Sequence, residues 1–249
     1  TFRKAASELH GLEPDNIMCC NGGDDLLSIA IRACCNHDRP LAYPVPTYSL
    51  YPVLSRLEGI EPVEIPFDSE CNLPARLAKT HAALTIVCNP NAPTATFIGI
   101  EELASLADEL AGVLLIDEAY VDFAEQNAVE LVKEFDNVIL LRSLSKGYSL
   151  AGLRFGYAIA STNLIDGLLK VKDSYNVDAV AIALATAAIK DQAHFRMNVA
   201  KVKADRQTLT EQLRTLGFDV ADSCTNFVLA TVEFHAKAVT PPDGTPLTF

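Results

Sequence analysis

The stretch Val138-Ile-Leu-Leu-Arg-Ser-Leu-Ser-Lys-Gly-Tyr-Ser-Leu-Ala-Gly-Leu-Arg154 decides the class of fold, because an apolar run turns abruptly into a polar motif. Its first four residues have the length and composition of a buried strand. A lysine just beyond such a strand, here Lys146, can lose its proton and attack an aldehyde. The hydroxyls of Ser143 and Ser145, with the guanidinium of Arg154, suit a phosphate dianion. Taken alone, the motif also fits an ordinary surface lysine after a strand.

Similar apolar runs recur on both sides of this stretch and alternate with segments of helical period. Such βαβ alternation predicts an α/β fold with a mostly parallel sheet in a large three-layer domain. Ligands of these sheets bind beyond the carboxyl ends of the strands, where the polar motifs of this chain lie. Strands are predicted over residues 17–20, 41–43, 61–65, 84–88, 113–116, 138–141 and 156–160, and helices over 24–33, 49–57 and 101–110.

After about residue 164 the alternation of strand and helix patterns gives way to long helical patterns. An Ala-rich stretch predicts one long helix to residue 189, and an amphipathic helix follows over 193–216 with Gly217 as its C-cap. Strands are predicted over 218–220 and 227–232, whereas 235–249 has no clear period. We therefore expect a large domain over 1–165, and an interdomain helix with part of a smaller α+β domain over 166–249.

Composition excludes several classes of function. The net charge of −12 argues against binding of nucleic acid or an anionic membrane. No apolar run reaches the length of a membrane helix, and the first residues lack the apolar core of a signal peptide. The seven cysteines have no metal-ligand spacing with the histidines. We expect buried, reduced cysteines, no metal site and a cytoplasmic location.

Further polar motifs follow other predicted strands. Asp117 ends the most apolar strand and Tyr120 comes three residues later; each fits an ordinary turn or core residue when taken alone. Asn21-Gly-Gly-Asp-Asp25 joins a strand to a helix, where close backbone approach and the helix N-terminus favour an anion. Tyr48 can lay an aromatic ring on a flat ligand, although a tyrosine there is more often core.

The order of the motifs is more specific than any one of them. They are Asn21-Gly-Gly-Asp-Asp25, Pro46-Thr-Tyr-Ser-Leu-Tyr51, Asn89-Pro-Asn-Ala-Pro-Thr94, Asp117-Glu-Ala-Tyr-Val-Asp-Phe123, Leu141-Arg-Ser-Leu-Ser-Lys146, Ala151-Gly-Leu-Arg-Phe-Gly-Tyr157 and Ser174-Tyr-Asn-Val177. In this order they resemble the fold-type I aminotransferases that depend on pyridoxal 5'-phosphate (PLP), and most of all their histidinol-phosphate aminotransferase branch. The resemblance covers nearly the whole chain, up to Asn226-Phe-Val-Leu229.

The resemblance implies a role for each matched residue. Lys146 would form a Schiff base with PLP and later move a proton between the substrate Cα and the cofactor. Asp117 would bind the pyridine nitrogen, Tyr120 the phenolic oxygen, and Tyr48 would stack on the ring. Asn176 would line the substrate side near the domain junction. The phosphate would be held by Gly23, Asp24, Ser143, Ser145 and Arg154.

The chain departs from the family pattern at one turn. The usual Asn-Pro-Thr-Gly is Ala92-Pro-Thr-Ala95 here, so an asparagine beside the phenolic oxygen is missing. We expect the neighbouring Asn91 to take over its hydrogen bond. Losing that bond outright should raise the pKa of the Schiff base and slow turnover without abolishing cofactor binding. Ala95 tests whether this turn needs a positive φ.

The resemblance also implies segments that the sequence does not contain. The family has an N-terminal arm whose tyrosine reaches the partner's cofactor, and C-terminal arginines that bind the substrate's carboxylate or phosphate. No arginine follows Leu229. We therefore expect this sequence to be part of a longer chain.

The function predicted by the resemblance is PLP-dependent transamination of L-histidinol phosphate with 2-oxoglutarate, in histidine biosynthesis. The resemblance further implies a homodimer with active sites at its interface. Three alternatives stay open: another aminotransferase, such as one for aromatic amino acids; a PLP-dependent decarboxylase of a phosphorylated amino acid; and a catalytically impaired PLP-binding remnant.

Overall fold

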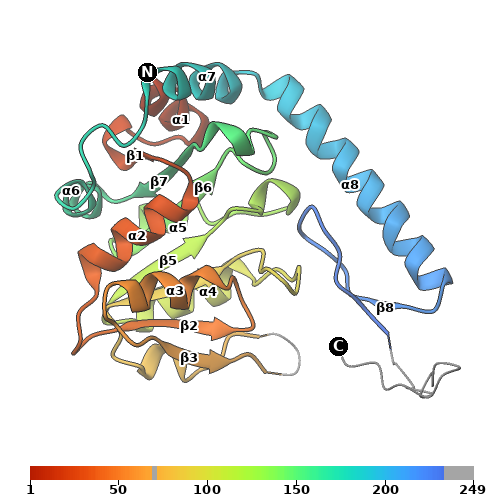
Figure 1. Cartoon of the computed structure of the whole chain (residues 1–249), viewed down its shortest axis with the longest axis horizontal. Helices are drawn as coiled ribbons and strands as arrows, with labels where there is room; N and C mark the ends of the chain where they lie inside the picture. Colours follow the sequence, from red (N-terminus) through yellow and green to blue (C-terminus); the bar gives the residue numbers. More distant parts are fainter. Residues whose placement is uncertain (69–71, 233–249) are drawn as a thin grey trace, which may run out of the picture.

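A seven-stranded sheet forms the centre of the structure, a computed structural model that describes residues 1–68 and 72–232 (Figure 1). Its strands lie in the order β1-β7-β6-β5-β4-β2-β3, and only β7 runs against its neighbours. The strands are β1 (Ile17–Cys20), β2 (Leu41–Val45), β3 (Val63–Pro66), β4 (Leu84–Cys88), β5 (Val113–Asp117), β6 (Val138–Ser143) and β7 (Gly156–Ala160). The predicted strands and their mostly parallel arrangement are confirmed, with ends that shift by one or two residues.

Helices cover both faces of the sheet, which gives three layers (Figure 1). Because side chains alternate along a strand, Leu114 and Ile116 of β5 pack on one face and Leu115 packs on the other. Helices α2 (Gly23–Cys34), α3 (Leu50–Leu57) and α6 (Thr162–Leu169) cover the face of Leu115. The opposite face carries α1 (Phe2–His10), α4 (Ile100–Glu109), α5 (Leu131–Glu134) and α7 (Ala179–Lys190).

The prediction of one long helix from residue 164 to 189 is wrong. The chain forms α6 and α7 with an irregular segment between them. Tyr175 in that segment has φ +61, in the left-handed region that ends helices. Asp178 then caps α7 by accepting a hydrogen bond from the N–H of Ala181 over 2.8 Å. Ala-rich composition favours helix, but it does not show where a cap interrupts it.

The C-terminal part of the described chain leaves the sheet along α8 (Gln192–Thr215), at the right of Figure 1. Gly217 follows this helix with φ +88, as expected for a residue after the last turn. A separate two-stranded sheet pairs β8 (Asp219–Val220) with β9 (Ala230–Thr231). The predicted domain boundary at residue 165 falls inside α6, and Cys71 and residues 233–249 lie outside the described residues.

Within residues 1–68 and 72–232 there are also four short 3₁₀ helices: η1 (Pro14–Asn16), η2 (Leu77–Lys79), η3 (Val121–Phe123) and η4 (Ala151–Leu153). The last two flank the ends of β5 and β6. In the part of the chain that the structure describes, no helix is long and apolar enough to cross a membrane.

Candidate active site

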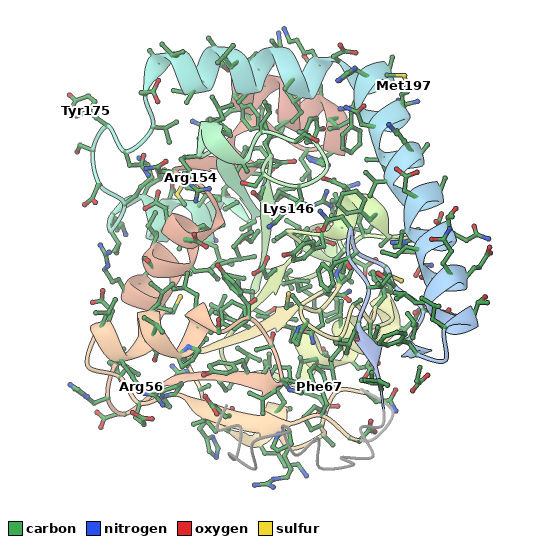
Figure 2. All side chains as sticks on the ribbon, turned by 45° about the vertical axis from the view of Figure 1, so that its right-hand side comes forward. Arg56, Phe67, Lys146, Arg154, Tyr175 and Met197 are labelled. Atoms are coloured by element: carbon green, nitrogen blue, oxygen red, sulfur yellow. The ribbon has the colours of Figure 1, made fainter. Side chains whose placement is uncertain are left out.

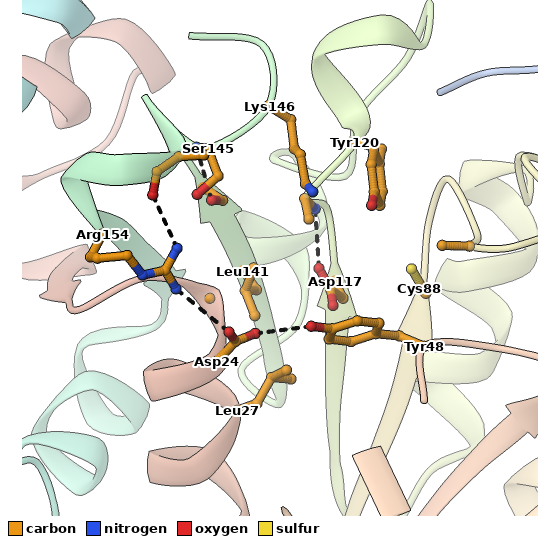
Figure 3. A pocket seen from close by; sticks show the side chains of 15 residues that line it. Asp24, Leu27, Tyr48, Cys88, Asp117, Tyr120, Leu141, Ser145, Lys146 and Arg154 are labelled. Atoms are coloured by element: carbon orange, nitrogen blue, oxygen red, sulfur yellow. Dashed lines mark hydrogen bonds and ion pairs between the residues drawn. The ribbon is translucent and has the colours of Figure 1, made fainter. Parts of the chain in front are cut away.

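The carboxyl ends of β4, β5 and β6 meet the N-terminus of α2 around a cavity of about 240 Å³ (Figure 3). Parallel strands bring their ends to the same edge of a sheet, so polar residues distant in sequence become neighbours there. The cavity is lined by Gly23, Asp24, Leu27, Tyr48, Cys88, Ala92, Asp117, Ala119, Tyr120, Leu141, Ser143, Ser145, Lys146, Ala151 and Arg154.

Asp117 lies at the base of the cavity, where β5 ends between Cys88 and Leu141 of the adjacent strands. Its Oδ2 accepts a hydrogen bond from the phenol of Tyr51 over 2.7 Å, and its Oδ1 accepts one from the N–H of Ala119 over 3.1 Å. Burial raises the pKa of this carboxyl to about 6, against the lowering effect of these two donors. A buried carboxylate that can accept further hydrogen bonds is suited to a cationic or N–H partner in the cavity.

The next residue, Glu118, points to the other face of the sheet. Its Oε2 accepts a hydrogen bond from Arg142 Nε over 2.6 Å, and its Oε1 accepts one from the N–H of Ala128 over 2.7 Å. Strand alternation therefore separates two adjacent carboxylates. Asp117 faces the cavity, whereas Glu118 forms a buried ion pair beneath it.

The opposite end of the cavity collects groups that bind anions. The helix α2 begins at Gly23, and the first N–H groups of a helix have no partner within it. Arg154 adopts φ +53 and brings its Nη2 to 3.5 Å from Asp24 Oδ2. Gly22 adopts φ +85, which favours glycine, and a Cβ there would lie 2.7 Å from Arg154 Nη2, so the end of the arginine would also have to move. With Ser143 and Ser145 on the cavity wall, this end forms a cradle for a phosphate group.

Lys146 reaches the cavity between these two ends (Figures 2 and 3). Its Nζ lies 5.0 Å from the centre of the Tyr120 ring. The turn that carries it is held by hydrogen bonds from the N–H of Ser145 to Ser143 Oγ and from the N–H of Ser149 to the Lys146 carbonyl. These hydrogen bonds fix the backbone of the turn, so the Lys146 side chain extends from a defined position above Asp117.

Tyr48 closes the side of the cavity, and Figure 3 shows its hydroxyl pointing across to Asp24. The hydroxyl donates a hydrogen bond to Asp24 Oδ1 over 3.4 Å. Its ring stands edge-on to that of Tyr51, at an interplanar angle of 87°. Burial is the main cause that raises the pKa of Tyr48, so the phenol stays protonated.

The structure brings together all of the predicted site residues except Asn91 and Asn176. The Asn91 amide is buried and already bonded, because it accepts from Thr47 and donates to Pro46 and Thr94. Ala92 lines the cavity instead, so Asn91 is not positioned to replace the missing asparagine.

Asn176 lies outside the cavity as well. Its amide donates to Asp25 over 2.7 Å and accepts from Lys172 over 2.6 Å, in a pocket on another side of the chain. The turn at Ala95 does adopt the positive φ that the family's glycine suggested, at +62. An alanine thus holds a conformation that costs most residues about 1–2 kcal/mol.

Sequence reasoning missed Tyr51 and Cys88, which surround Asp117. A signal for Tyr51 was present, since it stands in the same motif as Tyr48, Pro46-Thr-Tyr-Ser-Leu-Tyr51, and on the first turn of the predicted helix. Cys88 was read only as a small apolar residue. Among residues 1–68 and 72–232, no group of three or more His, Cys, Asp or Glu could hold a metal ion.

The donor set fits PLP. The anion cradle suits its phosphate, the buried carboxylate of Asp117 suits its protonated ring nitrogen, and the amine of Lys146 lies between them. The fold and the site thus define a PLP-dependent enzyme of fold type I. The chain belongs to the class I and II aminotransferase family, whose profile matches residues 1–238.

Individual relatives carry a more specific name. The chain is 49% identical over 244 residues to histidinol-phosphate aminotransferase 1 of Trichormus variabilis, covering 98% of this chain and 67% of the relative. It is 51% identical to the protein of that name from Nostoc sp., covering 92% and 65%. The crystal structure of histidinol-phosphate aminotransferase from Sinorhizobium meliloti in complex with PLP superposes with a TM-score of 0.84 at 26% identity, covering 91% and 64%. The chain spans about two thirds of the length of these relatives.

Proposed function

We propose that the protein transaminates L-histidinol phosphate with 2-oxoglutarate, as part of histidine biosynthesis. The observation that carries the proposal is the convergence of Lys146, Asp117 and Arg154 on one cavity, from the end of β5 and from the connection between β6 and β7. Two relatives that are 49% and 51% identical to this chain over the aligned residues bear the name histidinol-phosphate aminotransferase, which supports the choice of substrate.

The phosphate end would hold the cofactor through charge and hydrogen bonds. The N–H groups of Gly23 and Asp24 donate from the start of α2, and the hydroxyls of Ser143 and Ser145 donate from the turn after β6. Arg154 supplies the full positive charge and exchanges its partner Asp24 for the phosphate.

Asp117 would hold the N–H of the pyridine ring in its charged form. A pyridinium withdraws electrons from the bond that must break at the substrate α-carbon, which is the chemistry PLP supplies when bound. Tyr48 would lie against the ring, and the hydroxyl of Tyr120 would donate to its phenolic oxygen. Both side chains line the cavity at its mouth.

Lys146 would act twice at the same atom. Its Nζ would hold the cofactor covalently and, once the amino donor has freed it, would carry the proton from the substrate α-carbon to the cofactor. The proximity of the Tyr120 ring to Nζ keeps the amine over the cavity. The amino group then passes to 2-oxoglutarate in a second half-reaction, in ping-pong order.

The half-reactions test this proposal separately. Protein loaded with PLP is mixed with L-histidinol phosphate in the absence of 2-oxoglutarate. The visible absorbance of the bound cofactor should fall, one equivalent of ketone should form, and 2-oxoglutarate should restore the absorbance. Faster conversion of tyrosine or phenylalanine would favour an aromatic aminotransferase, and CO₂ release from a phosphorylated amino acid offered in place of histidinol phosphate would favour a decarboxylase.

A homodimer in the cytoplasm, with active sites at the subunit interface, belongs to the same proposal. It is supported by apolar side chains on α7 that no described residue covers, among them Val180 and Leu184, which are 67% and 52% exposed. The six cysteines of the described residues are free thiols. Light scattering should give twice the mass of one chain.

The division into a large cofactor-binding domain and a smaller C-terminal domain is proposed as well. The separate pairing of β8 with β9, outside the seven-stranded sheet, supports it. Limited proteolysis should then cut first between the two units.

A further inference from the structure

Tyr51 is fully buried on the first turn of α3, behind the wall of the cavity. Its phenol is the donor that contacts Asp117 Oδ2 over 2.7 Å. A tyrosine hydroxyl in such a position needs a partner, because an unbonded buried donor is costly. The partner here is the carboxylate assigned to the ring nitrogen, so Tyr51 reaches the cofactor end without lining the cavity.

Two donors fix the Asp117 carboxylate in space. Tyr51 holds Oδ2 and the N–H of Ala119 holds Oδ1, so the carboxylate cannot rotate without breaking one of the two bonds. An ionised carboxylate offers about four lone-pair sites. Each oxygen therefore keeps acceptor capacity for a further donor.

The surrounding charges disfavour the ionised form of Asp117. Burial raises its pKa, and the nearby carboxylates of Asp24 and Glu118 add to this effect. The hydrogen bond from Tyr51 is the largest opposing cause, followed by the N–H of Ala119. Cys88 is protonated in its buried position and brings no charge. Tyr51 is thus the side chain that most favours a carboxylate at the base of the cavity.

We propose that Tyr51 is a positioning residue for the ring nitrogen of PLP, which it serves by orienting Asp117 through its 2.7 Å hydrogen bond. The inference rests on the proposed function, since it presumes that Asp117 binds that nitrogen. Tyr51 thus has a role in cofactor binding although it does not line the cavity.

The chain contains a matched control in Tyr43. This tyrosine is also buried, its ring packs edge-on against that of Tyr51 at 5.6 Å, and its hydroxyl also donates to a carboxylate over 2.7 Å. The carboxylate is that of Glu64 on β3, which does not line the cavity. Both variants lose one hydroxyl that donates to a carboxylate, part-buried at Tyr43 and buried at Tyr51, and only Tyr51→Phe loses the contact with Asp117.

The experiment compares two ligands: PLP, and an analogue whose ring nitrogen is replaced by C–H. Tyr51→Phe should weaken PLP binding by about 10- to 100-fold, the value of a hydrogen bond to a charged group. It should leave the affinity for the analogue within about twofold of wild type. Tyr43→Phe should leave both affinities unchanged. Unfolding of the cofactor-free proteins checks that both variants are folded.

Equal weakening of both ligands by Tyr51→Phe would overturn the inference, because Tyr51 would then act only through packing. A second variant pair tests the same contact from the side of Asp117. In an Asp117→Asn background, adding Tyr51→Phe should change PLP affinity by less than about twofold, and a full additional loss would also overturn it. If wild type binds the analogue as tightly as PLP, Asp117 does not bind the nitrogen and the inference fails. If it binds neither, the proposed function fails with it.

Discussion

Arg142 Nε donates a hydrogen bond to Glu118 Oε2 over 2.6 Å, directly beneath the strand ends that carry Asp117 and Ser143. The side chains are 10% and 0% exposed, so water screens this ion pair very little. It ties the end of β5 to the end of β6 from the face opposite the cavity. The pair therefore supports the site without contacting it.

Replacing Glu118 by Gln should destabilise the protein by up to about 3–5 kcal/mol, because buried Arg142 loses the carboxylate it pairs with and keeps only the nearby charge of Asp122. Arg142 Nη2 already has no hydrogen-bond partner among the described residues, which leaves little means of compensation. Urea unfolding of the cofactor-free protein measures the change. Glu130→Gln is the control, since that carboxylate is 70% exposed and pairs with Lys133 at the surface. Similar losses for both variants would contradict this view.

Lys146→Ala should abolish the visible absorbance of covalently held PLP and lower transamination by at least about 100-fold. The fold should persist, because Lys146 forms no ion pair in the described residues. Absorbance before and after borohydride addition checks the result. Lys133→Ala removes a surface lysine instead and should keep both properties. If the Lys146→Ala protein keeps the absorbance, Lys146 is not the residue that holds PLP covalently.

Arg154→Ala should weaken PLP binding by about 10- to 100-fold and leave stability nearly unchanged. Its side chain is half exposed, and its pairing with Asp24 at 3.5 Å is too exposed to contribute much to folding. Titration of the cofactor-free protein with PLP and with pyridoxal lacking the phosphate gives the measurement. Only PLP binding should suffer, whereas Arg56→Ala, at a surface pair with Glu61, should affect neither ligand.

Two buried carboxyls should make the cofactor-free protein less stable as pH rises from about 4 to about 6, against the opposite effect of His10, whose pKa burial lowers to about 3. Burial raises the pKa of Asp117 and of Asp122 from an ordinary 3.8 to about 6, so the folded state binds more protons than the unfolded state in this window. Each carboxyl contributes on the order of 3 kcal/mol. Denaturation at several pH values measures the free energy of unfolding. Its decline with pH should be smaller for Asp117→Asn and the same as in wild type for Asp15→Asn, a change at an exposed residue.

Ala92→Asn should restore an amide at the cavity wall, where the family has one. A donor beside the phenolic oxygen of PLP favours the form of the cofactor that lacks the proton. The pH at which the visible absorbance changes should therefore move down, and turnover should rise. A pH titration of the absorbance measures this midpoint. An unchanged midpoint would show that the side chain at position 92 does not reach the cofactor.

The sequence was sufficient for the features that depend on period and order. Apolar runs predicted the strands of the sheet. The order of the motifs predicted that Lys146, Asp117 and Arg154 would lie at one site, and all three line the same cavity. The pattern could not predict which of two neighbouring residues faces a ligand. Asn91 and Ala92 differ in this respect because of hydrogen bonds to Pro46 and Thr47, which are distant in sequence.

Long-range partners were also beyond sequence reasoning. The contact between Tyr51 and Asp117 spans 66 positions, and neither residue type implies the other. The break between α6 and α7 depends on one capping aspartate, Asp178, within a stretch that otherwise favours helix. Physical chemistry explains both features once the fold has brought the groups together.

The position of β1 next to β7 has a consequence for biosynthesis. The first strand of the sheet pairs with the last, in a register that joins Ile17 to Ile159. A ribosome must therefore release nearly all of the sheet before its N-terminal strand can dock. Since Gly23 follows β1 and Arg154 precedes β7, the phosphate cradle is completed by the same late event. A nascent chain that ends before β7 should therefore have no affinity for PLP. Binding of PLP should then report that β1 and β7 have paired.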